Sequence, residues 1–238
     1  MPATGRGAQT VTMHTLRNIH ALQWAMAACG AASMLSAHLG ALGAYATFKP
    51  LTMVLALMCV WWLTRASRYP IARWLLLLGL LLSMVGDVSL LSADGFVPGL
   101  GAFLLAHLAY LGMLRRDSPR WLPHTPALLA CATAGALLYA YLWQHGLPST
   151  LRLPVLAYVG VIATMASQAL GRATALRTPA AWCVAAGALS FMLSDSLLAF
   201  DLFVQPLPNV YLWVLGSYYL AQWLIVHGML AVLRPQAH

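Results

Sequence analysis

Acidic residues are scarce in this chain of 238 residues: only five side chains are Asp or Glu, and all five are Asp. Charged residues of both signs make up 8% of the sequence, whereas 61% of the residues are hydrophobic. Soluble domains carry about 25% charged residues. So few polar side chains cannot cover a water-soluble globule of this size, and so hydrophobic a chain is not intrinsically disordered.

Paired cysteines are also missing. The four cysteines (Cys29, Cys59, Cys131 and Cys183) are scattered singly through apolar runs, without a CxxC motif. This spacing argues against a disulfide framework, a zinc site and a thioredoxin-like motif. The apolar runs also lack the alternation of polar and apolar residues that β-barrel strands show, and open sheets do not span lipid. The sequence therefore predicts an all-α, polytopic membrane bundle.

Eight apolar segments are candidates for crossing a bilayer, which takes roughly 17–25 residues at ~1.5 Å rise per residue. The predicted spans are residues 20–44, 49–64, 71–92, 98–114, 122–143, 153–170, 180–202 and 208–233. The second and the fourth of these are short. The loops are too short to form a soluble domain, so we expect residues 1–238 to form a single transmembrane domain, with residues 1–19 as a cytoplasmic N-terminal tail.

The basic residues predict the orientation of the bundle. Twelve of the thirteen are Arg, and Lys49 is the other. If the N-terminus is cytoplasmic, the outer segments hold only Lys49 and Arg152, and the inner segments hold the rest. The inner residues are Arg6, Arg17, Arg65, Arg68, Arg73, Arg115, Arg116, Arg120, Arg172, Arg177 and Arg234. This bias predicts eight spans with both termini in the cytoplasm, and the Arg-rich composition indicates a bacterial inner membrane.

Topology also explains the net charge of +8: the basic side chains lie in short loops between apolar spans. We therefore expect no nucleic-acid partner.

A weak internal repeat accompanies this topology. Gly79 and Asp87 on the third span have the same spacing as Gly187 and Asp195 on the seventh. The sequence GDVSL at 86–90 parallels SDSLL at 194–198. Because the two spans run in the same direction, the match suggests a parallel four-plus-four repeat about an axis along the membrane normal.

Two of the aspartates lie well inside predicted spans, where an ionisable group costs several kcal/mol unless it is paired or hydrated. Asp87 is about five residues from the outer end of its span and Asp195 about seven, which is roughly 8 Å and 10 Å of helix. Asp94, Asp117 and Asp201 lie in loops or at span ends, where we expect them to be solvated. The two deep carboxyls predict one shared site in the outer half of the membrane.

Other spans bring further polar side chains to the outer half or near the midplane. These are Lys49, expected at the outer mouth of the second span, and His107, Tyr158, Tyr218 and Gln222. Structural roles are open to them as well: each Asp could hold helices together, the histidine could pack as a neutral side chain, and the tyrosines could form helix contacts. Because the polar groups come from six spans, a single pocket that opens outward or to the outer leaflet is the more economical interpretation.

Several of these segments resemble the YhhN family of membrane proteins. The similar strings are Lys49-Pro50-Leu51, GDVSL at 86–90, GAFLLAHLAY at 101–110, SDSLL at 194–198 and YYLAQ at 218–222, within about residues 20–233. That family includes lysoplasmalogenases, which hydrolyse the vinyl-ether bond of lysoplasmalogens to a fatty aldehyde and glycerophosphoethanolamine or glycerophosphocholine. The resemblance implies the fold, a lysophospholipid substrate taken from membrane lipid, and a role for Asp87 and Asp195.

Vinyl ethers are cleaved by acid: a proton is transferred to the carbon β to oxygen, and water adds to the resulting oxocarbenium ion. Two carboxyl groups suit this chemistry, as they do in glycoside hydrolysis. Our hypothesis makes Asp195 the acid and Asp87 the anion, although the sequence does not distinguish the two. Lys49 would bind the phosphate. The water or the glycerol hydroxyls would be held by His107, Tyr158, Tyr218 and Gln222.

We expect no cofactor, no metal and no obligate protein partner. The leading alternative is a lipid or small-molecule transporter or binding protein with a proton-coupled Asp pair. An intramembrane aspartyl protease would need a Tyr-Asp pair and a GxGD motif, but residues 84–87 read MVGD. A zinc hydrolase of the seven-span ceramidase type would need several His or acidic ligands, and of the histidines only His107 is suitably placed.

Overall fold

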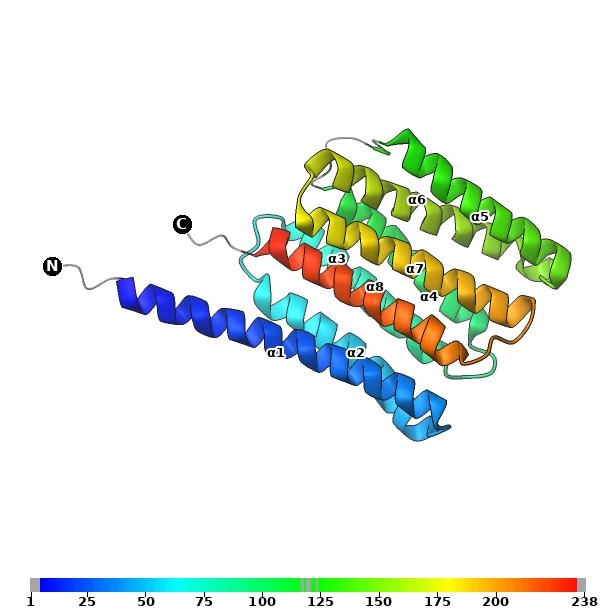
Figure 1. The fold of residues 1–238 in the computed structure, drawn as a ribbon, viewed down its shortest axis with the longest axis horizontal. Coiled ribbons are helices and arrows are strands. Elements are labelled where there is room, and N and C mark those ends of the chain that lie inside the picture. Colours follow the sequence, from blue (N-terminus) through cyan, green and yellow to red (C-terminus); the bar gives the residue numbers. More distant parts are fainter. Residues whose placement is uncertain (1–4, 117, 119–120, 123, 235–238) are drawn as a thin grey trace.

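The computed structural model describes residues 5–116, 118, 121–122 and 124–234, and for residues 5–20 it describes the backbone alone. Within these residues the protein is all-helical and has no strand, as predicted. The long helices run side by side, and α1 begins at the end of the bundle where α8 ends (Figure 1). Asp117 and Arg120, and the side chains of Arg6 and Arg17, lie outside the described part.

The described chain forms eight α-helices and one short 3₁₀ helix. They are α1 (Gly5–His38), α2 (Leu42–Leu63), α3 (Pro70–Ser89), α4 (Phe96–Leu114), α5 (Thr125–His145), η1 (Ser149–Leu151), α6 (Arg152–Leu176), α7 (Pro179–Phe203) and α8 (Val210–Leu233). Seven of them, α2 to α8, are long and apolar enough to cross a membrane. Over its described residues α1 does not meet that criterion, although it packs along α2 and α8.

The first two helices begin and end earlier than predicted. α1 ends at His38 rather than at 44, and α2 begins at Leu42 rather than at 49. The chain turns at Gly40, whose φ of +69° suits a residue without a side chain. Pro50, the second residue of the predicted span, lies inside α2, where it removes one helical hydrogen bond and its ring crowds the carbonyl one turn earlier. The second span is therefore 22 residues long and not short.

Other helix starts follow familiar local signals. α3 and α7 both begin with proline, whose missing N–H would have no helical partner at that position. The Thr178 hydroxyl accepts a hydrogen bond from the Ala181 N–H at 3.2 Å and so caps α7. These signals fix where α3 and α7 begin. Because three long helices separate α3 from α7, the two run in the same direction and their C-terminal ends lie at one end of the bundle.

The two halves of the chain repeat one pattern of helix contacts. Consecutive helices pack against each other within α1–α4 and again within α5–α8. The second helix of each half also contacts the fourth helix of the other half, so α2 touches α8 and α6 touches α4. This cross-packing is the pattern that a parallel four-plus-four repeat predicts.

Equivalent glycines mark where the paired helices approach most closely. A Cβ atom at Gly79 on α3 would overlap the ring of Tyr110 on α4. A Cβ atom at Gly187 on α7 would lie 2.8 Å from Cγ1 of Ile225 on α8. The repeated Gly–Asp spacing therefore combines a close helix contact with a carboxyl two turns further along the same helix.

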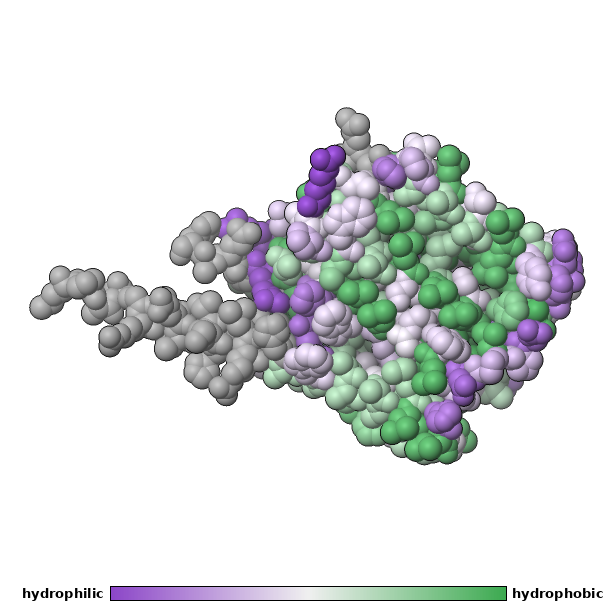
Figure 2. All heavy atoms as spheres, viewed as in Figure 1, coloured by the Kyte–Doolittle hydropathy of each residue, from purple (hydrophilic) through white to green (hydrophobic). Residues whose placement is uncertain are grey.

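The outer surface is apolar around the middle of the bundle. Figure 2 shows hydrophobic side chains along the sides of the helices and hydrophilic ones gathered at the two ends. Large apolar side chains such as Val88, Leu105 and Leu193 are exposed on these sides. A lipid environment accounts for this exposure, because in water such a surface would drive association.

Candidate active site

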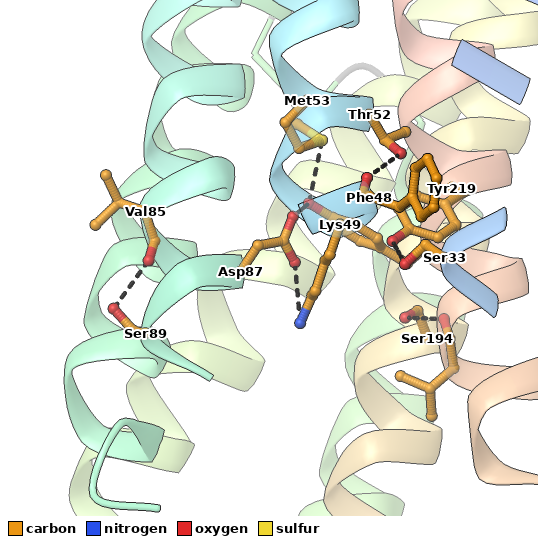
Figure 3. A network of polar contacts seen from close by, with 12 residues as sticks. Ser33, Phe48, Lys49, Thr52, Met53, Val85, Asp87, Ser89, Ser194 and Tyr219 are labelled. Atoms are coloured by element: carbon orange, nitrogen blue, oxygen red, sulfur yellow. Dashed lines mark hydrogen bonds and ion pairs between the residues drawn. The ribbon is translucent and has the colours of Figure 1, made fainter. Parts of the chain in front are cut away.

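The first carboxyl cluster forms where α2, α3 and α8 meet. The Asp87 side chain is 2% exposed, and its Oδ1 lies 3.4 Å from Nζ of Lys49 (Figure 3). The Tyr218 hydroxyl donates a hydrogen bond of 2.5 Å to Oδ2 of Asp87. The Asp87 carboxyl thus has an ammonium group on one oxygen and a phenol on the other.

Lys49 does not lie where the sequence indicated. It was predicted at the outer mouth of the second span, but it lies within α2 and is buried. Its ammonium group lies 5.5 Å from the centroid of the Tyr45 ring, one helical turn earlier. Tyr45 was not among the predicted site residues, although its i,i+4 spacing to Lys49 was a usable signal.

The second carboxyl cluster forms where α4, α6 and α7 meet. The Tyr158 hydroxyl donates a hydrogen bond of 2.5 Å to Oδ2 of Asp195. Nε2 of His107 lies 3.8 Å from the same oxygen, which is too long for a hydrogen bond. The Asp195 side chain is 17% exposed, so this carboxyl is more accessible than that of Asp87.

The His107 ring is fully buried against aromatic neighbours. Its centroid lies 4.6 Å from that of Phe191 and 5.4 Å from that of Tyr158, both in edge-to-face contact. Neither ring nitrogen has a hydrogen-bond partner among the described residues. The His107 side chain therefore packs against aromatic rings and makes no hydrogen bond with the described residues.

The two clusters are related by the repeat. Each Asp lies on the third helix of its half, α3 or α7. Each receives one partner from the second helix of the same half, Lys49 or Tyr158, and one from the fourth helix of the other half, Tyr218 or His107. The same cross-packing of helices therefore builds both carboxyl environments.

A single cavity of about 300 Å³ reaches both carboxyls, and we call it the polar cavity because charged and hydroxyl side chains stand among its apolar walls. Asp87, Lys49 and Tyr218 line one side of it, and Asp195 lines another. Asp201 also lines this cavity, and its Oδ1 accepts a hydrogen bond from the Leu207 N–H at 2.7 Å. Asp201 was expected only to be solvated, whereas it holds the loop between α7 and α8.

A second, apolar cavity of about 70 Å³ lies among α4, α5, α6 and α7. Leu138, Leu142 and Val155 are among its walls, and Asp195 belongs to its lining as well. Phe103 borders both cavities, and Gly86 leaves room for its ring beside α3. Asp195 therefore lies at the junction between a polar and an apolar space.

Two of the expected site residues do not line either cavity. Gln222 is fully buried and accepts a hydrogen bond of 2.9 Å from the Tyr110 hydroxyl. His107 reaches the cavities only through its neighbours Asp195 and Tyr158. Within the described residues, no three His, Cys, Asp or Glu side chains are grouped so that they could hold a metal ion.

These features give the site two chemically distinct carboxyls. One carboxyl contacts a cation and accepts a hydrogen bond from a phenol, and both contacts favour its anionic form. The other accepts a hydrogen bond from a neutral phenol and faces both cavities. Such a pair can supply a proton at one point and stabilise a positive charge at another.

Comparison with known proteins adds independent information. The sequence model of the YhhN family matches residues 44–229. Lysoplasmalogenase TMEM86B of Mus musculus is 38% identical over 156 residues, covering 65% of this chain and 63% of that protein. A lysoplasmalogenase of Mycobacterium tuberculosis is 34% identical over 172 residues, covering 68% and 64%. The uncharacterized membrane protein YhhN of Escherichia coli is 32% identical over 122 residues, covering 50% and 54%.

The matched region spans less than two thirds of the length of these relatives. No solved structure matches the chain.

Proposed function

This chain belongs to the YhhN family of multi-pass membrane proteins, and we propose that it is a lysoplasmalogenase. It would hydrolyse the vinyl-ether bond of a lysoplasmalogen to a fatty aldehyde and glycerophosphoethanolamine or glycerophosphocholine. The observation that carries this proposal is that Asp195 lines both the polar and the apolar cavity. In the substrate, the vinyl ether likewise lies where the polar glycerol part meets the hydrocarbon chain.

The two cavities suit the two parts of the substrate. The glycerophospho head group would lie in the polar cavity, beside Lys49 and Tyr45. The beginning of the alkenyl chain would lie in the apolar cavity, against Leu138, Leu142 and Val155. Burial of each methylene from water contributes about 0.8 kcal/mol, which favours this orientation over the reverse.

The first chemical step needs a general acid next to the vinyl carbon. We assign this role to Asp195 in its neutral form. Because the Tyr158 hydroxyl donates to Oδ2 of Asp195, the acidic proton is carried by Oδ1. It is transferred to the vinyl carbon β to oxygen: a C–H bond forms, the double bond is lost, and the adjacent carbon and the ether oxygen share a positive charge.

The second step needs an anion that faces this oxocarbenium ion. Asp87 supplies it, because Lys49 and Tyr218 stabilise its carboxylate form. A water molecule then adds to the positively charged carbon and returns a proton to the Asp195 carboxylate. The resulting hemiacetal collapses to the aldehyde and the glycerol alcohol.

The other expected residues act through the carboxyls in this scheme. Tyr158 and Tyr218 fix the orientation of Asp195 and Asp87, and His107 packs behind Asp195. Lys49 lines the polar cavity, but its first partner is Asp87, so it acts as a counter-ion before it acts as a phosphate ligand. These four residues are positioning residues.

We further propose that the bundle lies in a bacterial inner membrane with both termini in the cytoplasm. The basic side chains support this orientation. Arg65, Arg68, Arg116 and Arg177 follow α2, α4 or α6, at the end of the bundle where α8 also ends. Both cavities lie toward the opposite end, near the C-terminal ends of α3 and α7. They would then open toward the periplasmic leaflet.

Aldehyde release from a lysoplasmalogen by the purified protein in detergent tests the proposal. We expect aldehyde release from the vinyl-ether lipid and no fatty-acid release from an ester lysolipid with the same head group, since esters are not cleaved by carbon protonation. Asp195→Asn should lower release by roughly three orders of magnitude, because a general acid contributes about 10²–10⁴-fold.

Asp94→Asn is the matched control. Asp94 is exposed in the loop between α3 and α4, so this variant should keep wild-type activity. If the folded wild-type protein releases no aldehyde but binds the lipid, the proposal is wrong and the transporter or lipid-binding alternative is favoured. Near-normal release by Asp195→Asn would refute the role of this carboxyl.

A further inference from the structure

A lipid-facing groove lies far from both carboxyls, on the surface of α2 and α3 toward the turn that joins them. Its volume is about 400 Å³. Its lining residues are all apolar or aromatic: Leu57, Met58, Trp61, Trp74, Leu77, Leu78 and Leu81. The α3 residues that line it, 74–81, span about 10 Å of helix at ~1.5 Å per residue. These dimensions suit part of one acyl chain.

Two indole rings close the groove at the end nearest the turn. Trp61 and Trp74 meet edge to face with their centroids 5.7 Å apart. The guanidinium group of Arg73 lies 4.8 Å from the centroid of Trp61 and 4.9 Å from that of Trp74. Arg65 lies 6.0 Å from Trp61 and 4.4 Å from the neighbouring Trp62. Aliphatic side chains, indoles and guanidinium groups thus follow one another toward the end of the bundle.

Arg73 is unusually buried for a cation at this position. It is 8% exposed, and its Nε donates a hydrogen bond of 3.1 Å to the Thr64 hydroxyl. In the part of the chain that the structure describes, no carboxylate lies within ion-pair distance of Arg73. The described aspartates all lie toward the opposite end of the bundle. A buried cation needs a compensating charge, and the described residues provide none within ion-pair distance of Arg73.

From this geometry we propose that the α2–α3 groove binds one phospholipid with an anionic head group, taken from the leaflet that borders the α2–α3 turn. Its phosphate contacts Arg65 and Arg73, and one acyl chain follows the groove past Trp61 and Trp74. The order of guanidinium, indole and aliphatic groups matches the order of phosphate, glycerol ester and chain in such a lipid. The site is independent of the proposed hydrolase activity.

An interfacial aromatic belt is the simpler explanation for tryptophans at this depth. An aromatic belt does not require a buried arginine that contacts two indole rings and donates a hydrogen bond to a threonine hydroxyl, as Arg73 does. An arginine close to the phosphate of an anionic lipid at the membrane surface contributes about 1 kcal/mol, which is roughly fivefold in affinity. Two of them should therefore make the site select for head-group charge, and a belt would not.

Native mass spectrometry of the full-length protein in detergent tests this proposal, with phosphatidylglycerol and phosphatidylcholine of identical acyl chains as the two lipids. We expect the wild-type protein to retain one phosphatidylglycerol in preference to phosphatidylcholine. The double variant Arg65→Gln/Arg73→Gln should bind phosphatidylglycerol roughly 30-fold more weakly, because it lacks both attractions. Equal retention of the two lipids by the wild-type protein would overturn the proposal.

The double variant Arg116→Gln/Arg177→Gln is the matched control. It removes the same charge from exposed positions at the same end of the bundle and should keep the bound phosphatidylglycerol. An equal loss in both double variants would show general charge attraction and refute the site. Leu78→Trp provides a second test, because it fills the groove while both arginines remain. It should also release the lipid, and unchanged retention would contradict the acyl-chain position.

Discussion

Asp87 and Asp195 occupy equivalent positions in the two halves of the chain, yet their surroundings differ. Each accepts a hydrogen bond of 2.5 Å from a tyrosine. Asp87 has the Lys49 ammonium 3.4 Å away and is almost fully shielded, whereas Asp195 has only the His107 ring at 3.8 Å and faces both cavities. One scaffold used twice can therefore hold one carboxyl as an anion and leave the other free to carry a proton.

The contrast also concerns stability. A buried ion pair contributes little net stability, but the removal of one partner leaves an uncompensated charge and costs about 3–5 kcal/mol. Asp87 forms such a pair with Lys49, and Asp195 does not. The two carboxyls should therefore affect activity in the same way and folding in different ways.

The largest expected effect is the loss of activity when either Asp87 or Asp195 is replaced, and it can be separated from an effect on folding. Asp87→Asn and Asp195→Asn should each lower aldehyde release by roughly three orders of magnitude. Only Asp87→Asn should also lower the melting temperature in detergent, because it leaves the Lys49 ammonium buried without a counter-charge. Aldehyde release and thermal unfolding, measured on the same preparations, check both parts. Equal melting temperatures for the two variants would contradict the assigned ion pair.

The positions of the two carboxyls could be predicted from the sequence, because an ionisable residue stands out inside an apolar span. Their depth also pointed to a common level, and one cavity does reach both. Which tyrosine serves which carboxyl could not be predicted. That pairing depends on two helix contacts, of α8 with α3 and of α6 with α7. Tyr218 and Asp87, which the first contact brings together, are more than a hundred positions apart in the sequence.

Two errors have physical causes that the sequence hid. Lys49 was placed at the mouth of its span because the predicted span began at that residue, but α2 begins seven residues earlier, at Leu42, and continues through Pro50 despite the hydrogen bond that proline removes. Gln222 was expected at the site from its depth, its i,i+4 spacing to Tyr218 and its place in the family-like segment YYLAQ. Depth does not fix the direction of a side chain, and Gln222 points to Tyr110 rather than into a cavity.

A smaller effect tests the ion pair itself. Lys49→Met alone should destabilise the protein by about 3 kcal/mol, because it leaves Asp87 buried without a cation. The double variant Lys49→Met/Asp87→Asn should be more stable than either single variant, since neither charge remains. Unfolding in detergent of the four proteins gives the coupling energy. If the effects of the two substitutions are simply additive, Lys49 and Asp87 do not form the pair that their 3.4 Å separation indicates.

The smallest expected effect is a change in KM when one of the two cavities is partly filled. Ala199 lines only the apolar cavity and Ala93 only the polar one. Ala199→Phe should raise KM about tenfold for a long-chain lysoplasmalogen and much less for a short-chain one, since it displaces a few methylenes worth about 0.8 kcal/mol each. Ala93→Phe should raise KM equally for the long-chain and the short-chain substrate, because the new ring occupies space in the polar cavity, where the head group binds. Steady-state kinetics with two chain lengths check this. A chain-length effect at Ala93, or none at Ala199, would show that the hydrocarbon chain does not enter the apolar cavity.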